Sequence, residues 1–342
     1  MNSFLGFAVW LALGGMALAM DWARLPSLPD DHGFAGSFAG VSQGCLIVAG
    51  GTNFPREKPW ESGKKVWYDR VYALSEPTGK WQILGQLPRP NAYGVSVTTN
   101  SGFLLIGGGD AQQHFDSVFR LESNCGHVVT KALPALPKPC AFMTGAVDEN
   151  RIYIAGGIQH PDDTQAMEQL WMLDLKALSL GWQTLPLCPG KPRILAQMAA
   201  IDGAIYLIGG AALHPGKDGK AVREWLRDAW RFSVREGWVA LANVPNEVVA
   251  APSPLLAVSG KLWIFGGDDG LHVDFQPKEK HPGFPKRILA YDTIHDHWAL
   301  VSGLPFALVT TPLVPWRGRW VVPGGESRPG TRSTEVWWSQ MP

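Results

Sequence analysis

The sequence predicts an all-β fold, a six-bladed β-propeller, on three observations. Its 342 residues include 39 Gly, 27 Pro and 16 Trp but only 18% charged residues, a composition typical of β proteins with many tight turns. An apolar run ends in a glycine pair six times, and a Leu-Pro or Val-Pro segment recurs at the same interval. Regular repetition of this kind indicates a repeat architecture.

The glycine pairs set the period of the repeat. The runs that end in them are LIVAGG (46–51), FLLIGGG (103–109), IYIAGG (152–157), IYLIGG (205–210), LWIFGG (262–267) and WVVPGG (320–325). Successive pairs lie about 50 to 58 residues apart, which is the period of kelch repeats, and each kelch repeat forms one four-stranded blade. We therefore expect strand b of each blade to end at a glycine pair.

The proline segments mark the outermost strand, d. Five of them follow a glycine pair: WQILGQLP (81–88), HVVTKALPALP (127–137), WQTLPLCP (182–189), WVALANVP (238–245) and WALVSGLP (298–305). A sixth, DWARLPSLP (21–29), comes before the first glycine pair. The last blade therefore takes its strand d from the N-terminal segment, paired beside EVWW (335–338), and this closure removes two exposed strand edges.

The long connections are expected to share one face of the propeller. Antiparallel strands place the segments after the glycine pairs at the same end of each blade as the residues after strand d, which include Arg89, Tyr93, Lys138 and Arg193. The segments after the glycine pairs are long and polar: 52–69, 158–169, 211–228, 268–286 and 326–335. Long insertions on one face favour a ligand site there. The alternative is that these segments are solvated surface loops with no ligand.

Residues 1–19 are predicted to be a cleaved export signal. They carry no charged side chain and end in Ala17-Leu18-Ala19, a small-x-small pattern. Residues 20–342 would then form a single propeller domain in the periplasm or outside the cell. A retained membrane anchor is the alternative.

Cysteines and charge carry further expectations. Export would permit disulfides, with Cys125 and Cys140 the most plausible pair and Cys45 a buried thiol. Lys and Arg balance Asp and Glu at 30 each, which argues against a nucleic-acid or anionic membrane partner.

Four segments carry a resemblance to a known family. DWARLPSLPDDHGFAGSFAG (21–40), GGTNFP with KPWESGKKVWYD (50–69), LPRPNAYGVS (87–96) and GGESRPGTRS (324–333) together resemble the N-acetylneuraminate epimerase, or sialic acid mutarotase, family of kelch propellers. In members of that family the last segment precedes the others, so this chain resembles a cyclically permuted branch. The resemblance implies interconversion of the α and β anomers of N-acetylneuraminate without a cofactor.

The resemblance also implies a catalytic pair, Glu326 and Arg332. Mutarotation requires a group that takes the anomeric proton and returns one to the ring oxygen, which one carboxylate can do. The substrate carboxylate requires a cation, and a guanidinium binds it through two oriented hydrogen bonds. Arg332 is the first candidate for that cation and Arg89 the second. A salt bridge that only stiffens a turn is the alternative for Glu326 and Arg332.

Further substrate-binding candidates are Asn53, Lys64 and Lys65, which could hydrogen-bond substrate oxygens, and Arg328, which stands where the family often has Lys. Tyr93 either lines the central opening or is buried on a strand. No metal site is expected, because neither the Asp nor the His residues follow a metal-ligand spacing.

The sequence is compatible with two classes of function. The first is a sugar-acid isomerase, on N-acetylneuraminate or on another sugar acid. The second is a non-catalytic kelch module that binds a glycan or a protein. Fold analogy does not separate these readings.

Overall fold

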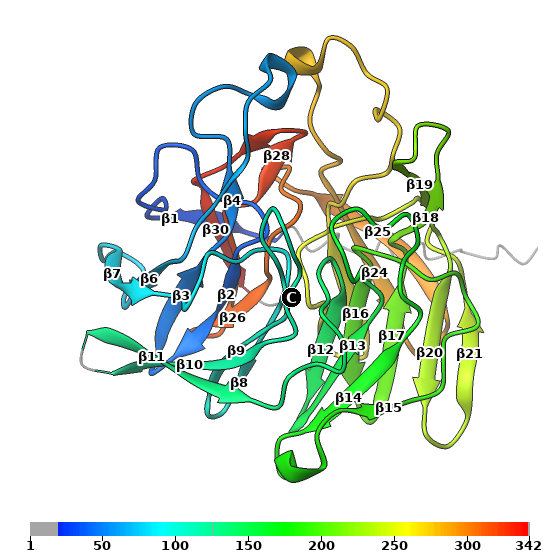
Figure 1. The fold of residues 1–342 in the computed structure, drawn as a ribbon. Helices are drawn as coiled ribbons and strands as arrows, with labels where there is room; N and C mark the ends of the chain where they lie inside the picture. The colour runs from blue at the N-terminus through cyan, green and yellow to red at the C-terminus, as the bar shows by residue number, and fades with distance from the viewer. Residues whose placement is uncertain (1–19, 125, 341–342) are drawn as a thin grey trace, which may run out of the picture.

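Six four-stranded antiparallel sheets surround a central axis in the computed structural model, which describes residues 20–124 and 126–340 (Figure 1). The predicted six-bladed propeller is therefore confirmed. No helix among the described residues is long and apolar enough to cross a membrane. The predicted export signal, residues 1–19, lies outside the described residues.

Each blade contributes one strand to each of four concentric layers. The innermost strands are β2 (Phe38–Ser42), β8 (Val95–Thr99), β12 (Thr144–Asp148), β16 (Gln197–Ile201), β22 (Leu256–Val258) and β26 (Val314–Trp316). The second strands, which end at the glycine pairs, are β3 (Cys45–Ala49), β9 (Gly102–Ile106), β13 (Arg151–Ala155), β17 (Ala204–Ile208), β23 (Lys261–Phe265) and β27 (Arg319–Pro323). The third are β6 (Arg70–Leu74), β10 (Val118–Asn124), β14 (Leu170–Asp174), β20 (Ala229–Ser233), β24 (Arg287–Asp292) and β30 (Val336–Gln340). The outermost are β7 (Gln82–Gln86), β11 (His127–Leu133), β15 (Gln183–Thr184), β21 (Gly237–Leu241), β25 (His297–Gly303) and β1 (Trp22–Leu25).

The second strands are apolar without a break because both of their faces are buried between blades. In β3, Leu46 and Val48 pack into a core shared with the last blade, whereas Ile47 and Ala49 pack into a core shared with the next blade. Side chains alternate between the two faces of a strand, so a strand buried on both sides must be apolar at every position.

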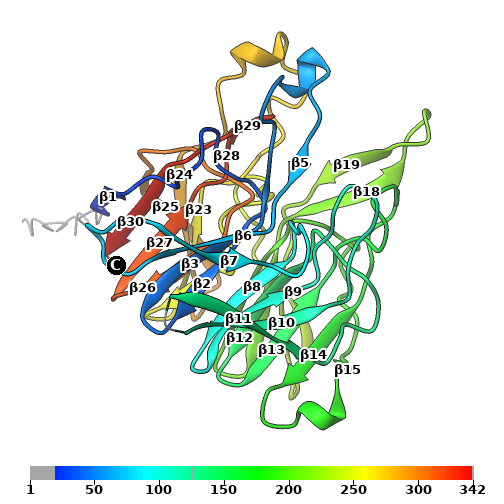
Figure 2. The same cartoon turned by 60° about the vertical axis from the view of Figure 1, so that its left-hand side comes forward.

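The two ends of the described chain meet in one blade, as predicted. Strand β1 pairs with β30 in antiparallel register from Trp22 opposite Ser339 to Leu25 opposite Val336. This blade is completed by β27 and β26 (Figure 2). The N-terminal strand thus covers the edge that β30 would otherwise expose.

The tryptophan that opens strand d binds the neighbouring blade. The indole N–H groups of Trp81, Trp182 and Trp238 donate to the carbonyls of Pro26, Pro134 and Pro186 at 2.8, 2.9 and 2.8 Å. Each acceptor is the proline of a Leu-Pro pair that follows the preceding strand d. The recurrence of Trp and Leu-Pro at one interval therefore reflects a contact between consecutive blades.

Six residues with left-handed backbone form a hydrogen-bonded ring around the axis. These ring residues are Gly36, Tyr93, Phe142, Leu195, Ala250 and Thr310, with φ between 54° and 67°. Each amide donates to the carbonyl of the ring residue before it, and Gly36 closes the ring on Thr310, at distances of 2.7 to 2.9 Å. The ring therefore fixes the spacing of all six blades near the axis.

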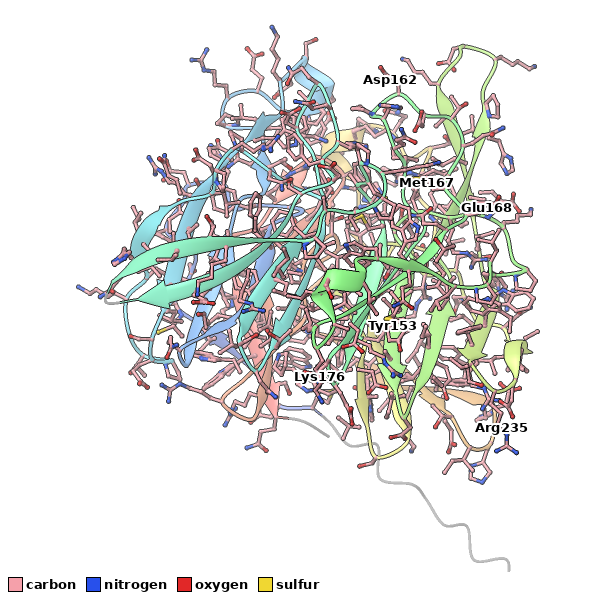
Figure 3. The ribbon with its side chains drawn as sticks, turned by 60° about the horizontal axis from the view of Figure 1, so that its bottom comes forward. Tyr153, Asp162, Met167, Glu168, Lys176 and Arg235 are labelled. Carbon is pink, nitrogen blue, oxygen red and sulfur yellow. The ribbon has the colours of Figure 1, made fainter. Side chains whose placement is uncertain are left out.

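The connections after the glycine pairs gather on one face, as predicted. They contain the hairpins β4–β5 (Thr52–Asn53, Val66–Trp67), β18–β19 (Ala211–Pro215, Ala221–Trp225) and β28–β29 (Glu326–Arg328, Thr331–Arg332), with the 3-10 turns η1 (Pro59–Glu61) and η3 (Lys278–Lys280). A further turn, η2 (Leu178–Leu180), joins β14 to β15. Figure 3 separates the two faces: Asp162 and Glu168 lie at one end of their blade and Lys176 at the other.

Cys140, the expected disulfide partner of Cys125, is a free thiol, and Cys125 lies outside the described residues. Cys140 is fully buried, its Sγ lies 3.4 Å from the carbonyl oxygen of Gly156, and burial raises the pKa of the thiol. Cys45, predicted to be buried, is only half-buried.

The terminal closure makes a direct prediction about stability. Removing residues 1–25 deletes β1 and exposes β30 and the apolar contacts of Trp22 and Leu25, so we expect the free energy of unfolding to fall by more than about 4 kcal/mol. Removing residues 1–19 retains β1 and should leave the free energy unchanged. Denaturant unfolding of the two truncated chains measures the difference, and equal stability would contradict the structural role of β1.

Candidate functional site

A cavity of about 770 Å³ opens on the face that carries the long connections. Its walls come from four of the five predicted segments, 52–69, 211–228, 268–286 and 326–335, while segment 158–169 contributes no lining residue. Its floor is formed by five of the six ring residues, Tyr93, Phe142, Leu195, Ala250 and Thr310. A smaller chamber of about 80 Å³ lies below the same residues, so the ring separates the two spaces.

Glu326 and Arg332 form an ion pair in the wall of this cavity. They are opposite each other in the β28–β29 hairpin, and Arg332 Nη1 donates to Glu326 Oε1 at 2.8 Å. The amide of Gly330 donates to the same oxygen at 2.6 Å. Both hydrogen bonds therefore fall on Oε1, and Oε2 accepts none from the described residues. The six-residue separation seen in the sequence is the span of this hairpin.

Arg332 is held almost out of solvent. Its side chain is 4% exposed, against 18% for Glu326, and its guanidinium lies 4.7 Å from the centre of the Phe54 ring. Nε donates to the carbonyl of Thr52 at 3.4 Å and Nη2 to the hydroxyl of Tyr93 at 3.5 Å. These contacts from the first two blades fix the guanidinium, which in turn fixes the carboxylate.

Tyr93 and Lys65 continue the same wall. The hydroxyl of Tyr93 lies 2.8 Å from Oγ1 of Thr52, and its ring stacks on Phe142 at 4.7 Å between centroids. Nζ of Lys65 lies 5.2 Å from the centre of the Tyr93 ring. Of the sequence candidates, the structure thus brings Glu326, Arg332, Tyr93 and Lys65 together at the cavity.

The other four candidates are placed elsewhere. The guanidinium of Arg89 stacks on Phe115 at 4.4 Å, and Arg89 and Lys64 are exposed and do not line the cavity. Asn53 is 1% exposed and fully engaged: its amide donates to Asp30 and Gly33, and its oxygen accepts from Tyr68. Arg328 donates to the carbonyl of Glu279 at 3.0 Å, which ties the β28–β29 hairpin to the segment 268–286.

The wall formed by segments 211–228 and 268–286 contains residues that the sequence analysis did not select. Trp225 on β19 donates to Asp268 at 3.3 Å, and His281 lies near His272, with ring centroids 5.8 Å apart. Burial, together with the charge of His272, lowers the pKa of His281. Its Nδ1 accepts the amide of Gly283, so the neutral ring carries its proton on Nε2. Apart from Trp225 on β19, these side chains lie on irregular loops, and no periodic sequence pattern marks them.

Metal-ligating residues do not converge in this cavity. Across residues 20–124 and 126–340, no group of three or more His, Cys, Asp or Glu side chains is arranged to hold a metal ion.

Sequence comparison relates this chain to one enzyme family. The family model described as N-acetylneuraminate epimerase matches residues 13–129. Proteins named N-acetylneuraminate epimerase from Haemophilus influenzae and Salmonella arizonae are 42% identical over 106 residues and 41% identical over 102 residues. The first match covers 27% of this chain and 28% of the relative, and the second covers 26% of each. These matches confirm the family resemblance seen in the sequence, over about a quarter of the length of these relatives.

A solved structure entitled "Structure of YjhT" shares the fold. It is similar over 91% of this chain and 95% of its own, with a TM-score of 0.67 and 17% sequence identity. The family model ends at residue 129, well before Glu326, so the chemistry proposed for the β28–β29 hairpin depends on the geometry described above.

Gly36 tests how the ring supports the cavity. A Cβ on Gly36 would lie 2.5 Å from Cδ1 of Tyr93, whereas a Cβ on Gly44 meets no atom within 4 Å, although both residues have left-handed backbone. We expect Gly36→Ala to lower the free energy of unfolding by about 1 to 3 kcal/mol more than Gly44→Ala does, because only the first displaces a ring residue. If thermal unfolding gave equal losses of stability for the two variants, Tyr93 would be able to move away from the added methyl group without a loss of stability.

Proposed function

We propose, starting from the relationship of this chain to the N-acetylneuraminate epimerases, that it is a sialic acid mutarotase. It would interconvert the α and β anomers of N-acetylneuraminate by acid/base ring opening, without a cofactor. The observation that carries the proposal is the Glu326 carboxylate, held at the cavity wall by Arg332 and Gly330 through one oxygen, with the second oxygen free.

The free oxygen suits the proton transfers of mutarotation. Oε2 of Glu326 takes the proton of the anomeric hydroxyl, the C2–O bond to the ring oxygen breaks, and a keto group forms at C2. The ring oxygen receives a proton from the carboxyl group, directly or through a water molecule. Rotation about the bond between C2 and C3 presents the other face of the ketone, and the same transfers in reverse close the ring as the other anomer.

Arg332 acts in this scheme as a positioning residue. Its guanidinium is 4% exposed and already bound to Glu326, Thr52 and Tyr93, so little of it remains for a substrate carboxylate. The structure therefore favours orientation of Glu326 by Arg332 over the direct clamp expected from the sequence. The residues for substrate contact on this wall are Lys65 and Tyr93.

Glu326→Gln tests the mechanism. The amide keeps the size of the side chain but cannot accept and return a proton, so we expect the catalysed rate of anomer interconversion to fall by about 10²- to 10⁴-fold. Proton NMR after release of the α anomer by a sialidase follows the rate. Glu279→Gln, at an exposed glutamate that does not line the cavity, is the matched control and should keep the rate of the unaltered chain.

Three outcomes separate the readings of the site. Binding of N-acetylneuraminate with no acceleration by the unaltered chain would favour a non-catalytic kelch module. Acceleration that persists in Glu326→Gln would overturn the role of the carboxylate. A panel of sugar acids in the same assay shows whether N-acetylneuraminate or another sugar acid is the preferred substrate.

We also propose that residues 1–19 direct export, so that the propeller acts in the periplasm or outside the cell. This proposal rests on the apolar run and the Ala17-Leu18-Ala19 pattern. Expression of the full chain in a bacterial host followed by cell fractionation should give a periplasmic protein whose first residue is Met20. A cytoplasmic product that retains residue 1 would refute it.

A further inference from the structure

We propose that Arg223, on the β18–β19 hairpin, binds the carboxylate of the sugar acid. This inference rests on the proposed function, because it assigns the anionic group of the substrate to a second part of the cavity that Glu326 lines. It names the ligand class as an α-keto sugar acid in its ring form, which carries a carboxylate on the anomeric carbon.

Arg223 is the arginine of the cavity that no carboxylate in the described part of the chain binds. Four cationic side chains line the cavity: Lys65, Arg223, Lys278 and Arg332. Arg332 is paired with Glu326, Nζ of Lys278 donates to the carbonyl of Val273 at 2.7 Å, and Lys65 lies against the rings of Trp67 and Tyr93. Arg223 is exposed and forms no ion pair with any carboxylate in the described part of the chain.

The side chains of β19 alternate between two faces of the strand, and the two faces make different contacts. Arg223 and Trp225 line the cavity and lie, with Ala221, on the same face of the strand, because residues two apart point the same way; Val222, on the other face, also lines the cavity. Glu224 lies between them and points to the other face, where it contacts residues outside the cavity. Arg223 therefore lies on the face of β19 that also carries Trp225, whereas the carboxylate of Glu224 is bound on the other face.

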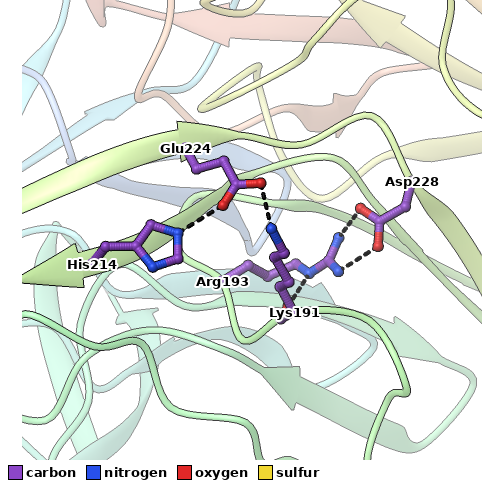
Figure 4. A network of polar contacts seen from close by, with 5 residues as sticks. All are labelled: Lys191, Arg193, His214, Glu224 and Asp228. Carbon is purple, nitrogen blue, oxygen red and sulfur yellow. Dashed lines mark hydrogen bonds and ion pairs between the residues drawn. The ribbon is translucent and has the colours of Figure 1, made fainter.

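Glu224 holds the hairpin in place from its outer face. Lys191 Nζ lies 2.5 Å from Glu224 Oε1, and Nε2 of His214 lies 2.6 Å from Oε2 (Figure 4). The hydrogen bonds from Lys191 and His214 lower the pKa of Glu224. Lys191 belongs to the connection after the neighbouring strand d, so this contact joins the hairpin to the adjacent blade.

A bidentate ion pair anchors the foot of the same hairpin. Nη1 and Nη2 of Arg193 donate to the two oxygens of Asp228 at 2.7 and 2.6 Å, and the Arg193 side chain is 2% exposed (Figure 4). Arg193 Nη1 also donates to the carbonyl of Gly209 at the end of β17. The hairpin is thus fixed at its foot by Arg193 and along its length by Lys191, which pre-orients Arg223 for binding.

The chemistry of a carboxylate matches this arrangement. A guanidinium forms two parallel hydrogen bonds with a carboxylate, and such bonds are about twice as strong as those between neutral groups. Asp268 and Asp274 on the same wall accept hydrogen bonds and suit sugar hydroxyls. We therefore expect Arg223 to discriminate a sugar acid from its neutral ester.

Calorimetric binding of N-acetylneuraminate and of its C1 methyl ester to the full chain tests the assignment. Arg223→Ala should weaken binding of the acid by about 10- to 100-fold and leave binding of the ester unchanged. Arg223→Lys should retain part of the affinity for the acid, because a lysine keeps the positive charge but cannot form the two parallel hydrogen bonds of a guanidinium. Arg235→Ala is the matched control, an exposed arginine in the β20–β21 turn on the far face (Figure 3).

Glu224→Gln separates positioning from direct contact. Glu224→Gln should raise the hydrogen-exchange rate of residues 211–225 and reduce the affinity for the acid less than Arg223→Ala does. Arg223→Ala should leave the exchange rate of these residues unchanged. Equal affinity of Arg223→Ala and the unaltered chain for the acid would overturn this inference while leaving the mutarotase proposal standing. Loss of acid binding in Arg223→Ala, with no acceleration by the unaltered chain, would support the anion site and refute the proposed function.

Discussion

The hydrogen-bonded ring around the axis is the constraint on which the rest of the structure depends. Each of its six amides donates to the neighbouring blade, and the bond from Gly36 to Thr310 joins the first blade to the last. Because the bonds form a closed cycle, displacing one ring residue strains both neighbours. Five of the six ring residues form the floor of the cavity, so the spacing of the blades also sets the shape of the site.

The cavity brings together segments that are far apart in the sequence. The β28–β29 hairpin stands between the segment with η1 and the segment with η3, whose 3-10 turns lie side by side above it (Figures 1 and 2). Gly330 packs on Pro59 of η1, and Arg328 binds the carbonyl of Glu279 in η3. Glu326 is therefore oriented by contacts to both sides of the hairpin, which is the condition for a fixed acid/base group in an open cavity.

Sequence reasoning succeeded where a pattern has one physical cause. The Gly-Gly, Trp and Leu-Pro landmarks predict six blades because they recur once per blade, and in four blades the Trp marks an indole hydrogen bond to the blade before it. The displaced DWARLP segment predicts the terminal closure. The family resemblance singled out Glu326 and Arg332, which the structure pairs across the β28–β29 hairpin. The contacts that side chains make in the long segments were not predictable from the sequence. All polar atoms of the Asn53 side chain are hydrogen-bonded to Asp30, Gly33 and Tyr68, and Arg223 reaches the cavity only because β18 pairs with β19.

The pairing of β1 with β30 has a consequence for how the molecule is made. Among the described strands, β1 is translated first and its partner β30 last. Five blades can assemble during chain elongation, but the sixth waits until β30 has been synthesised, and for its passage across the membrane if it is exported. An unpaired, tryptophan-bearing segment therefore persists throughout biogenesis, and a truncated translation product cannot complete the circle.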